Sequence, residues 1–515
     1  MTTLIDIISN TEGPLKAKGE IRKKACFYKK TGDSLPTLAI SKIHAWEVPV
    51  LEYADKIKQK FLREGSVLGE GWQRIEVGMD DIAKLYEGTI DLENSTNGQT
   101  QQQESILGLI WEAMQKNASD IHFRNGGDEC QIWMRVDGFL EKHRTIHAAE
   151  GERLCSTIYG SMCDICESTY VPRKAQDGRL AKTVLDQIQL YGARVATRPT
   201  DEGNVFVLRL LYSHGGAAKL DEIGYLPEQL HLVSRMTRRT TGINIFSGAT
   251  GSGKSTSMKV LLTELVSVFN NQINLLTIED PPEYVISGAV QTPVLYESDD
   301  PLHISNAWAS SISNAMRLDP DVLMIGEMRD KASSIAAFRA AITGHGVWTT
   351  LHANSAVQIL DRLKDIGVPI EFLTDASLIS GLINQSLAPL NCEQCKRPIQ
   401  NHWDQVDPTT KARLEANLQL DSVFLAGEDK NCPSCGGKGF KGRHVVAECI
   451  VPNQKFMDIY RASGSGEARR YWVNELSGIT KCAHLKRLIN MGLVDPLLGE
   501  QKVCPLDEDL ALFGN

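Results

Sequence analysis

The sequence predicts an α/β protein with a parallel β-sheet at its centre and a smaller α+β domain before it. Between residues 223 and 390, short apolar runs such as INIF, NLLTI, VLMIG and VWTTLH alternate with helix-length segments, which is typical of βαβ units. Between residues 105 and 212, the runs CQIWMRVDGFL and NVFVLRLL alternate with helical stretches, which indicates an antiparallel sheet. Two pairs of cysteines follow the βαβ segment, and a helical tail closes the chain.

A glycine-rich loop, GATGSGKST, lies between the apolar run INIF and a helix-length segment. Gly248, Gly253, Lys254 and Ser255 have the spacing of a P-loop, in which glycines let backbone N–H groups converge on phosphate. The N-terminus of the following helix adds its positive dipole end. A chance Gly/Ser-rich turn is the alternative, but the strand before and the helix after favour the P-loop. The expected nucleotide-binding residues are Gly248, Ala249, Thr250, Gly251, Ser252, Gly253, Lys254, Ser255 and Thr256, with Lys254 at the β/γ-phosphates and Ser255 on Mg²⁺.

Acidic side chains follow two of the predicted parallel strands. Glu279, Asp280 and Glu283 come after NLLTI, and Glu327 comes after VLMIG. Because ligands bind beyond the carboxyl ends of such strands, these carboxylates should face the phosphates and the metal. One of them could polarise a water for attack on the γ-phosphate. The alternative is that these acids are solvent-exposed loop residues without a role. Two acidic clusters near one P-loop favour the functional interpretation.

Twelve cysteines are many for a chain expected to stay in the cytoplasm. Four of them form two CxxC pairs, Cys392 with Cys395 and Cys432 with Cys435. Two such pairs can supply four thiolates to a tetrahedral structural zinc site, and reduced cysteines without metal are the alternative. A third pair, Cys163 and Cys166, has no partner pair nearby and is interpreted as buried or incidental thiols.

Length and composition indicate an ordinary globular protein of about three domains. The chain has 515 residues, 23% of them charged and 42% hydrophobic, and a net charge of −9 that argues against nucleic acid as the main partner. The start lacks the features of a signal peptide, and no apolar stretch is long enough to span a bilayer. We therefore expect a cytoplasmic protein without direct membrane insertion, docked on a membrane complex.

The chain is divided into six predicted parts. They are an N-terminal region that ends in the polar linker ENSTNGQTQQQE (1–104), a small α+β domain (105–212), a hinge (213–222), the P-loop core (223–390), a tetracysteine segment (391–445) and a helical region (446–515).

The motifs resemble those of a known family. GATGSGKST, TIEDPPEY, RLDPDVLMIGEMRD and TGHGVWTTLHANSA resemble, in order, the Walker A motif, Asp box, Walker B motif and His box of the secretion ATPases of type II secretion and type IV pili. ASDIHFR, RVDG and QDGR resemble the preceding domain of that family. The resemblance, over about residues 105 to 450, implies a RecA-like core after a PAS-like α+β domain. The CxxC pairs and GFKGR match the branch that assembles pili or pseudopili, in which a type IVb or thin-pilus ATPase is one candidate.

The resemblance also implies roles for single residues. Glu283 would activate the attacking water, and Glu327 would orient water and metal. His345 and His352 would sense the γ-phosphate, although each would more often be a packed structural histidine. Arg194 and Arg209 would be arginine fingers that act on a neighbour's nucleotide; surface arginines are the alternative. The chain departs from the family at Ser386, usually arginine, and at Lys331, where an acidic residue is common.

The function implied by the resemblance is that of a homohexameric ATPase. It would use ATP, with ADP as product, together with magnesium and structural zinc. Hinge motion would act on a platform protein of the inner membrane and so assemble a pilus or pseudopilus. The alternatives are a type II secretion ATPase proper, a retraction ATPase, a conjugative or DNA-handling motor and a regulatory ring that works as an adaptor.

Overall fold

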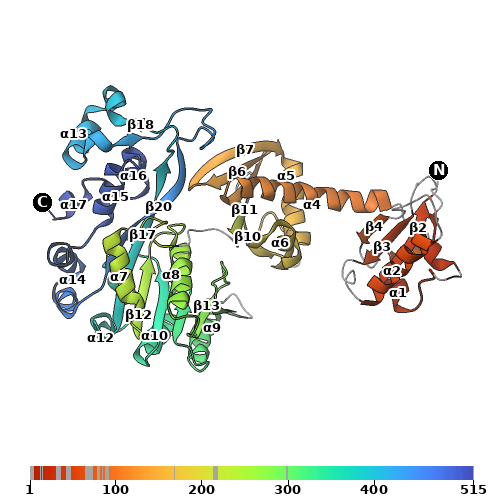
Figure 1. Ribbon diagram of the computed structural model, residues 1–515, viewed down its shortest axis with the longest axis horizontal. Helices are drawn as coiled ribbons and strands as arrows, with labels where there is room; N and C mark the ends of the chain where they lie inside the picture. The colour runs from red at the N-terminus through yellow and green to blue at the C-terminus, as the bar shows by residue number, and fades with distance from the viewer. Residues whose placement is uncertain are drawn as a thin grey trace. The chain divides into compact units, whose positions relative to one another are not determined.

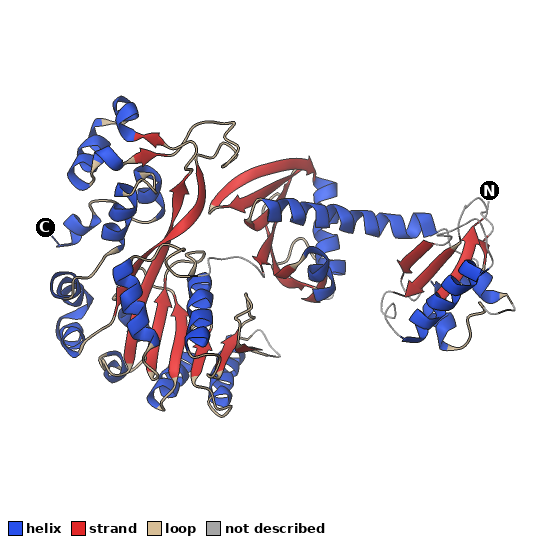
Figure 2. Cartoon of the chain, in the orientation of Figure 1, coloured by secondary structure: helices blue, strands red, loops and turns tan. Residues whose placement is uncertain are grey.

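The chain forms two compact units, one of residues 1–111 with 152–162 and one of residues 112–151 with 163–515 (Figures 1 and 2). The computed structural model describes residues 5–11, 13, 15–30, 36–41, 48–63, 73–77, 82–83, 85–86, 92–167, 169–212, 219–296 and 300–513. Most of the predicted hinge, residues 213–218, lies outside the described residues.

The first unit contains a four-stranded sheet that the sequence did not reveal. Its order is β1 (Ile5–Asp6), β2 (Ala25–Lys30), β3 (Thr37–Ser41) and β4 (Gln73–Val77), with only the last pair parallel. Its helices are α1 (Glu20–Lys24), α2 (Val48–Arg63) and the short η1 (Ile8–Asn10). Phe27 and Ile57 belong to one buried cluster, and Tyr28 and Leu85 belong to a second. The N-terminal region therefore has its own hydrophobic core.

The predicted polar linker is helical rather than turn-rich. Residues 93–104 lie within α4 (Leu92–Gln115), which continues into the apolar stretch SILGLIWEAM. Glutamine and glutamate are good helix formers, and the amphipathic end of the helix extends through them. The turn residues Asn and Gly in this stretch suggested a linker, and the neighbouring helix outweighs them.

An antiparallel sheet of seven strands confirms the predicted α+β character of the small domain. Its order is β7 (Phe139–His147), β6 (Glu129–Val136), β5 (Ala118–Gly126), β11 (Gly203–Tyr212), β10 (Leu190–Pro199), β9 (Gln176–Leu180) and β8 (Cys163–Cys166). Along the chain between these strands lie α5 (Ala148–Thr157), a π-helical turn (Ile158–Met162) and α6 (Lys182–Ile188). Strands β10 and β11 pair in a register that places Arg194 directly opposite Arg209.

Cys163 and Cys166 stand on the edge strand β8 of this sheet. A bulge between Cys163 and Ile165 interrupts the alternation of this strand, and the two thiols belong to no cluster of three or more possible metal ligands among the described residues. Cys163 is half-buried and Cys166 is exposed, so of the two interpretations, buried or incidental, the second is supported.

A second seven-stranded sheet confirms the predicted parallel core. Its order is β14 (Ala289–Pro293), β13 (Leu275–Glu279), β15 (Val322–Ile325), β16 (Gly346–Leu351), β12 (Gly242–Ser247), β17 (Ile379–Asn391) and β20 (Phe440–Ile450). Only β20 is antiparallel to its neighbour, and it comes from beyond residue 390. Strands β12, β13, β15 and β16 are buried along their whole length, which explains their nearly continuous apolar sequences.

Helices cover both faces of the parallel sheet (Figure 1). On one face pack α7 (Pro227–Thr237) and α8 (Lys254–Val268). On the other pack α9 (Pro301–Ala315), α10 (Lys331–Ile342), α11 (Gln358–Ile366), α12 (Ile370–Leu373) and α14 (Gln454–Glu475). The carboxyl ends of the parallel strands therefore open at a single edge between these helical layers.

The remaining elements follow the core. They are β18 (Arg397–Pro398), η4 (Ile399–Gln405), α13 (Pro408–Asn417), η5 (Leu420–Ser422), β19 (Phe424–Leu425), α15 (Lys481–Asn490), α16 (Pro496–Lys502) and α17 (Glu508–Phe513). Residues from α13, α15 and the tail share one buried cluster with Ala388 and Val446 of the core sheet. Among the described residues, no helix combines the length and the apolar character needed to cross a bilayer.

Candidate functional site

The glycine-rich loop connects β12 to α8 and has the backbone of an anion-binding loop. Gly248, Gly251 and Gly253 have φ values of 145°, 78° and 86°, which side-chain-bearing residues rarely adopt. A Cβ on Gly248 would lie only 2.3 Å from the carbonyl oxygen of Gln385. The Lys254 ammonium donates hydrogen bonds to the carbonyl oxygens of Gly248 (2.8 Å) and Ala249 (3.1 Å). The predicted strand–loop–helix context is thus present.

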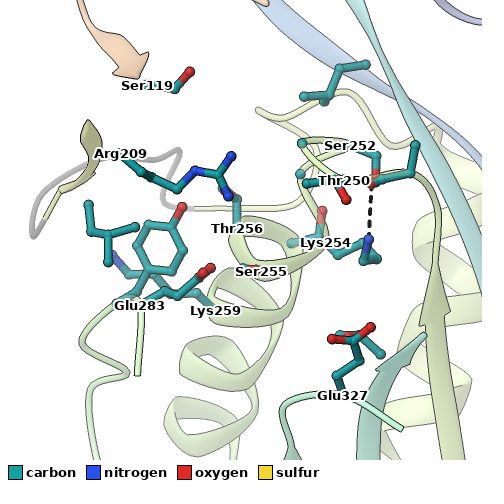
Figure 3. A pocket seen from close by; sticks show the side chains of 18 of the residues that line it. Ser119, Arg209, Thr250, Ser252, Lys254, Ser255, Thr256, Lys259, Glu283 and Glu327 are labelled. Carbon is teal, nitrogen blue, oxygen red and sulfur yellow. Dashed lines mark hydrogen bonds between the residues drawn. The ribbon is translucent and has the colours of Figure 1, made fainter. Parts of the chain in front are cut away.

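A cavity of about 910 Å³ opens over this loop. Residues 249–256 line it, together with the carboxylates of Glu283 and Glu327 from two strand ends. Figure 3 shows Lys254 near Glu327, with Glu283 and Arg209 on the other side of the start of α8. Burial lowers the pKa of the Lys254 ammonium, and the two carboxylates act to raise it. The cavity therefore combines phosphate-binding groups with acids, as the sequence predicts for this edge of the sheet.

Arg329 connects the two acidic clusters, and sequence reasoning did not single it out. Its Nε donates to Glu327 (2.8 Å), and its guanidinium lies 3.7 Å from a carboxylate oxygen of Asp280. Glu279 is buried instead and accepts hydrogen bonds from Thr277 (2.7 Å) and Gln291 (2.9 Å). Burial raises the pKa of the Glu279 carboxyl group. Glu279 is thus held by neighbouring side chains, and Asp280, Glu283 and Glu327 line the cavity with it.

Arg194 and Arg209 both line the cavity from the antiparallel sheet. Arg194 donates to the carbonyl oxygens of Asp280 (3.2 Å) and Pro281 (3.3 Å) and lies 3.6 Å from a carboxylate oxygen of Glu283. Burial lowers the pKa of the Arg194 guanidinium, and Glu283 acts against that effect. These contacts are made within one chain, whereas the sequence-based prediction is that the arginine serves a neighbouring subunit.

Arg209 forms an ion pair that the sequence did not predict. Its Nε donates to a carboxylate oxygen of Asp120 at 2.9 Å, and the Arg135 guanidinium lies 3.9 Å from the other oxygen. Asp120 itself is almost fully buried. Its place in the motif ASDIHFR was the only sequence signal for it.

The two predicted sensor histidines lie at opposite ends of β16. His352 follows the carboxyl end of the strand; its Nδ1 donates to the carbonyl oxygen of Gly248 (3.0 Å), and its Nε2 lies 3.3 Å from Glu327. His345 precedes the strand, where its Nδ1 contacts the carbonyl oxygen of Ala340 (3.0 Å). A six-residue strand is about 20 Å long. The cavity lining includes His352 and not His345, so the chain's own geometry gives the sensor role of His345 no support.

Two polar side chains, those of Gln385 and Tyr225, hold the P-loop through hydrogen bonds, and sequence analysis singled out neither of them. The Gln385 side chain donates to the carbonyl oxygen of Ser252 (2.8 Å) and accepts a hydrogen bond from Tyr225 (2.8 Å). Both side chains are buried. Ser386, which stands where the resemblance implies an arginine, lines the cavity and pairs with Val446 of β20. Arg443 lines the same cavity, three residues further along the β17–β20 pair, opposite Pro389.

The four predicted zinc ligands come together in space. Their sulfur atoms all lie within 4.8 Å of one another, with Cys392 to Cys432 at 3.8 Å and Cys395 to Cys435 at 3.6 Å. Zn–S bonds of about 2.3 Å in a tetrahedron separate the sulfurs by about 3.8 Å, so the cluster fits this ion. Gly427 packs so closely on Cys395 that a Cβ would lie 2.3 Å from its sulfur. The backbone at Gly427 thus packs directly against the cysteine cluster.

We expect one zinc ion per chain, lost when any of the four cysteines is replaced. Because metal-binding energy is folding energy at such a site, Cys432→Ser should also loosen residues 391–445. Metal analysis of protein purified without chelator tests this, with Cys166→Ser, an exposed thiol on β8, as the matched control. Less than about a tenth of an equivalent in the unaltered protein would contradict the assignment.

Comparisons with known proteins agree with this site. The family described as "Type II/IV secretion system protein" matches residues 96–487. The "Type II secretion system ATPase E" of Vibrio cholerae serotype O1 is 30% identical over 429 residues, which cover 82% of this chain and 80% of that protein. The "Type IV pilus assembly ATPase PilB" of Thermus thermophilus is 32% identical over 416 residues, 79% of this chain and 42% of that protein. The crystal structure of the Legionella pneumophila ATPase DotB has the same fold, with a TM-score of 0.51, 21% identity and coverage of 76% and 93%.

Proposed function

Because the chain belongs to the family of type II/IV secretion system proteins, we propose that it hydrolyses ATP to power the assembly of a type IV pilus or pseudopilus. The observation that carries the proposal is the cavity that Lys254 of the P-loop, Glu327 and Glu283 all line. A nucleoside triphosphate needs cationic and N–H donors for its phosphates and an acid to position water. This cavity is lined by both kinds of group.

In this proposal the backbone of residues 248–256 cradles the phosphates and Lys254 reaches the β/γ-phosphates. Ser255, at the first turn of α8, is positioned to ligate magnesium, which would neutralise charge on the phosphates when bound. Glu283 accepts the proton of the attacking water, and Glu327 orients that water. His352 senses the γ-phosphate, and Arg194 and Arg209 stabilise charge on it. The contact of His352 with both Gly248 and Glu327 supports its part.

The proposed working form is a homohexamer on the cytoplasmic side of the inner membrane, bound to a platform protein and to no nucleic acid. The division of the chain into the six parts named above, with a hinge at residues 213–222, is part of this proposal. Change in the angle between the small domain and the P-loop core would supply the motion. The four-stranded sheet of the N-terminal region offers a folded body for docking.

Assembly is favoured over retraction because the tetracysteine cluster belongs, by resemblance, to the assembling branch. Type II secretion is the second candidate, and the name of the Vibrio cholerae relative favours it. A DNA-handling motor is less well supported, since the net charge is −9.

Cells that lack this chain test the proposal. We expect the loss of surface filaments, restored by the unaltered chain and not by Glu327→Gln, because assembly needs hydrolysis. Filaments more numerous than in the parent strain would identify a retraction ATPase. Intact filaments with loss of secreted enzymes would identify a type II secretion ATPase.

A further inference from the structure

The fully buried carboxylate of Glu448 is hydrogen-bonded to the loop after β16, which begins with His352. Glu448 on β20 has no exposed surface, and its Oε2 accepts a hydrogen bond from the backbone N–H of Ala356 (2.9 Å). Its Oε1 accepts from the Arg469 guanidinium of α14 (2.8 Å) and, at 3.5 Å, from the N–H of Lys481 at the start of α15. One side chain therefore ties the loop after β16 to two C-terminal helices.

The same loop is fixed at two further backbone positions. Asn384, which lies directly opposite Glu448 in the β17–β20 pair, donates to the carbonyl oxygen of Ala353 (2.8 Å). The Lys481 ammonium donates to the carbonyl oxygen of Asn354 (2.8 Å). Residues 353–356 are thus held from behind by three side chains, while His352, the residue before them, contacts the cavity.

A purely stabilising role explains this arrangement poorly. Removing two charges from water costs about as much as their attraction returns, so a buried ion pair is weak evidence for stability. The second carboxylate oxygen of Glu448, however, accepts a hydrogen bond from the backbone N–H of Ala356. This residue belongs to the loop that directly follows His352, so its position helps to fix the histidine at the cavity. That geometry makes the ion pair a support for the site.

We infer that Glu448 is a positioning residue, which acts through residues 353–356 to hold His352 against Gly248 and Glu327. Arg469 holds the carboxylate in place through its hydrogen bond, so α14 is connected to the nucleotide site. The inference rests on the proposed function for its effect on rate. Its structural part, the tie between Glu448 and the loop, does not depend on that function.

Glu448→Gln is the main test, because it keeps the shape and replaces one oxygen by an NH₂ group. That group must face either the N–H of Ala356 or the Arg469 guanidinium, and both are donors. The matched control is Glu500→Gln. Glu500 also accepts from an arginine, Arg413 (2.9 and 3.0 Å), and from a backbone N–H, that of Leu506 (3.0 Å), but it does not touch the loop.

Amide hydrogen exchange in the nucleotide-free chain measures the tie itself. Glu448→Gln should speed exchange in a peptide that covers residues 353–358 by about tenfold or more, and Glu500→Gln should leave that peptide unchanged. Unchanged exchange there in Glu448→Gln would overturn the inference. If this variant fails to fold, Glu448→Asp keeps the charge, shortens the side chain so that it no longer reaches the N–H of Ala356, and should speed exchange in the same peptide by about fivefold. No change in that variant would overturn it equally.

A double-mutant cycle with His352→Ala measures whether the effect passes through the histidine. Glu448→Gln alone should lower the rate of ATP hydrolysis by about tenfold or more, with ATP affinity within about twofold. In the His352→Ala background it should cost less than about twofold, since the histidine it positions is gone. Effects that multiply would contradict the inference. Absence of hydrolysis by the unaltered chain would instead refute the proposed function, and the exchange experiment would still decide the role of Glu448.

Discussion

Replacing Arg194 by alanine is expected to lower the rate of ATP hydrolysis by about 10³- to 10⁵-fold, the usual contribution of an arginine finger. Arg194 lines the nucleotide cavity, lies 3.6 Å from Glu283 and is fixed by two backbone carbonyls, so its position is defined before the substrate arrives. A guanidinium held in this way stabilises charge on the transferring phosphoryl group without reorganisation. Steady-state phosphate release by the purified chain measures the loss.

Arg198→Ala is the matched control, since Arg198 lies on the same strand, is exposed and lies outside the cavity lining. It should hydrolyse ATP at the unaltered rate. Full activity of an Arg194→Ala, Arg209→Ala double variant would reject the finger assignment.

Mixed subunits decide whether the finger serves its own chain or a neighbour. Arg194→Ala and Glu327→Gln subunits are each expected to be inactive. If the finger acts on a neighbour, mixing them creates interfaces where an intact site meets an intact finger, and part of the activity returns. If it acts within the chain, as its contact with the chain's own Glu283 suggests, verified mixing restores nothing.

The second large effect is expected at Glu327. Glu327→Gln should slow hydrolysis by about 10²- to 10³-fold, the range found when one preorganised electrostatic group is removed. The carboxylate is held by Arg329 (2.8 Å) and lies 3.3 Å from His352, so the amide loses the ion pair with Arg329 while its volume stays the same. ATP should still bind, because Lys254 and the loop backbone are untouched.

Glu228→Gln is the control for this substitution. Glu228 is an exposed glutamate on α7 that pairs with Arg487 at 2.8 Å, outside the cavity lining. Its loss should leave both binding and hydrolysis unchanged. Lys254→Ala should differ from Glu327→Gln by weakening nucleotide binding as well, since it removes the cation at the phosphates.

The sequence predicted those features that depend on local pattern. The P-loop, the parallel strands and the pairing of four cysteines each follow from spacing within a short stretch or between two such stretches. Glu327 and Glu283 could be placed at one edge because parallel strands end together.

Features that depend on long-range packing could not be predicted in this way. Gln385 supports the P-loop from a strand more than a hundred residues away, and nothing in its neighbourhood marks it. Glu448 is one acid among many until the fold brings it to Ala356. His345 looked equivalent to His352, and only the direction of β16 separates them. The N-terminal sheet went unnoticed because no motif accompanies its short strands.

The measurement that tests the central claim most directly is phosphate release from magnesium ATP by the purified full chain and by Glu327→Gln, with ATP binding measured in the same samples. We predict continuous release by the unaltered chain, ATP affinities that agree within about threefold, and release at least about 10²-fold slower in the variant. Equal rates in the two proteins would contradict the account, as would an unaltered chain that binds ATP and releases no phosphate.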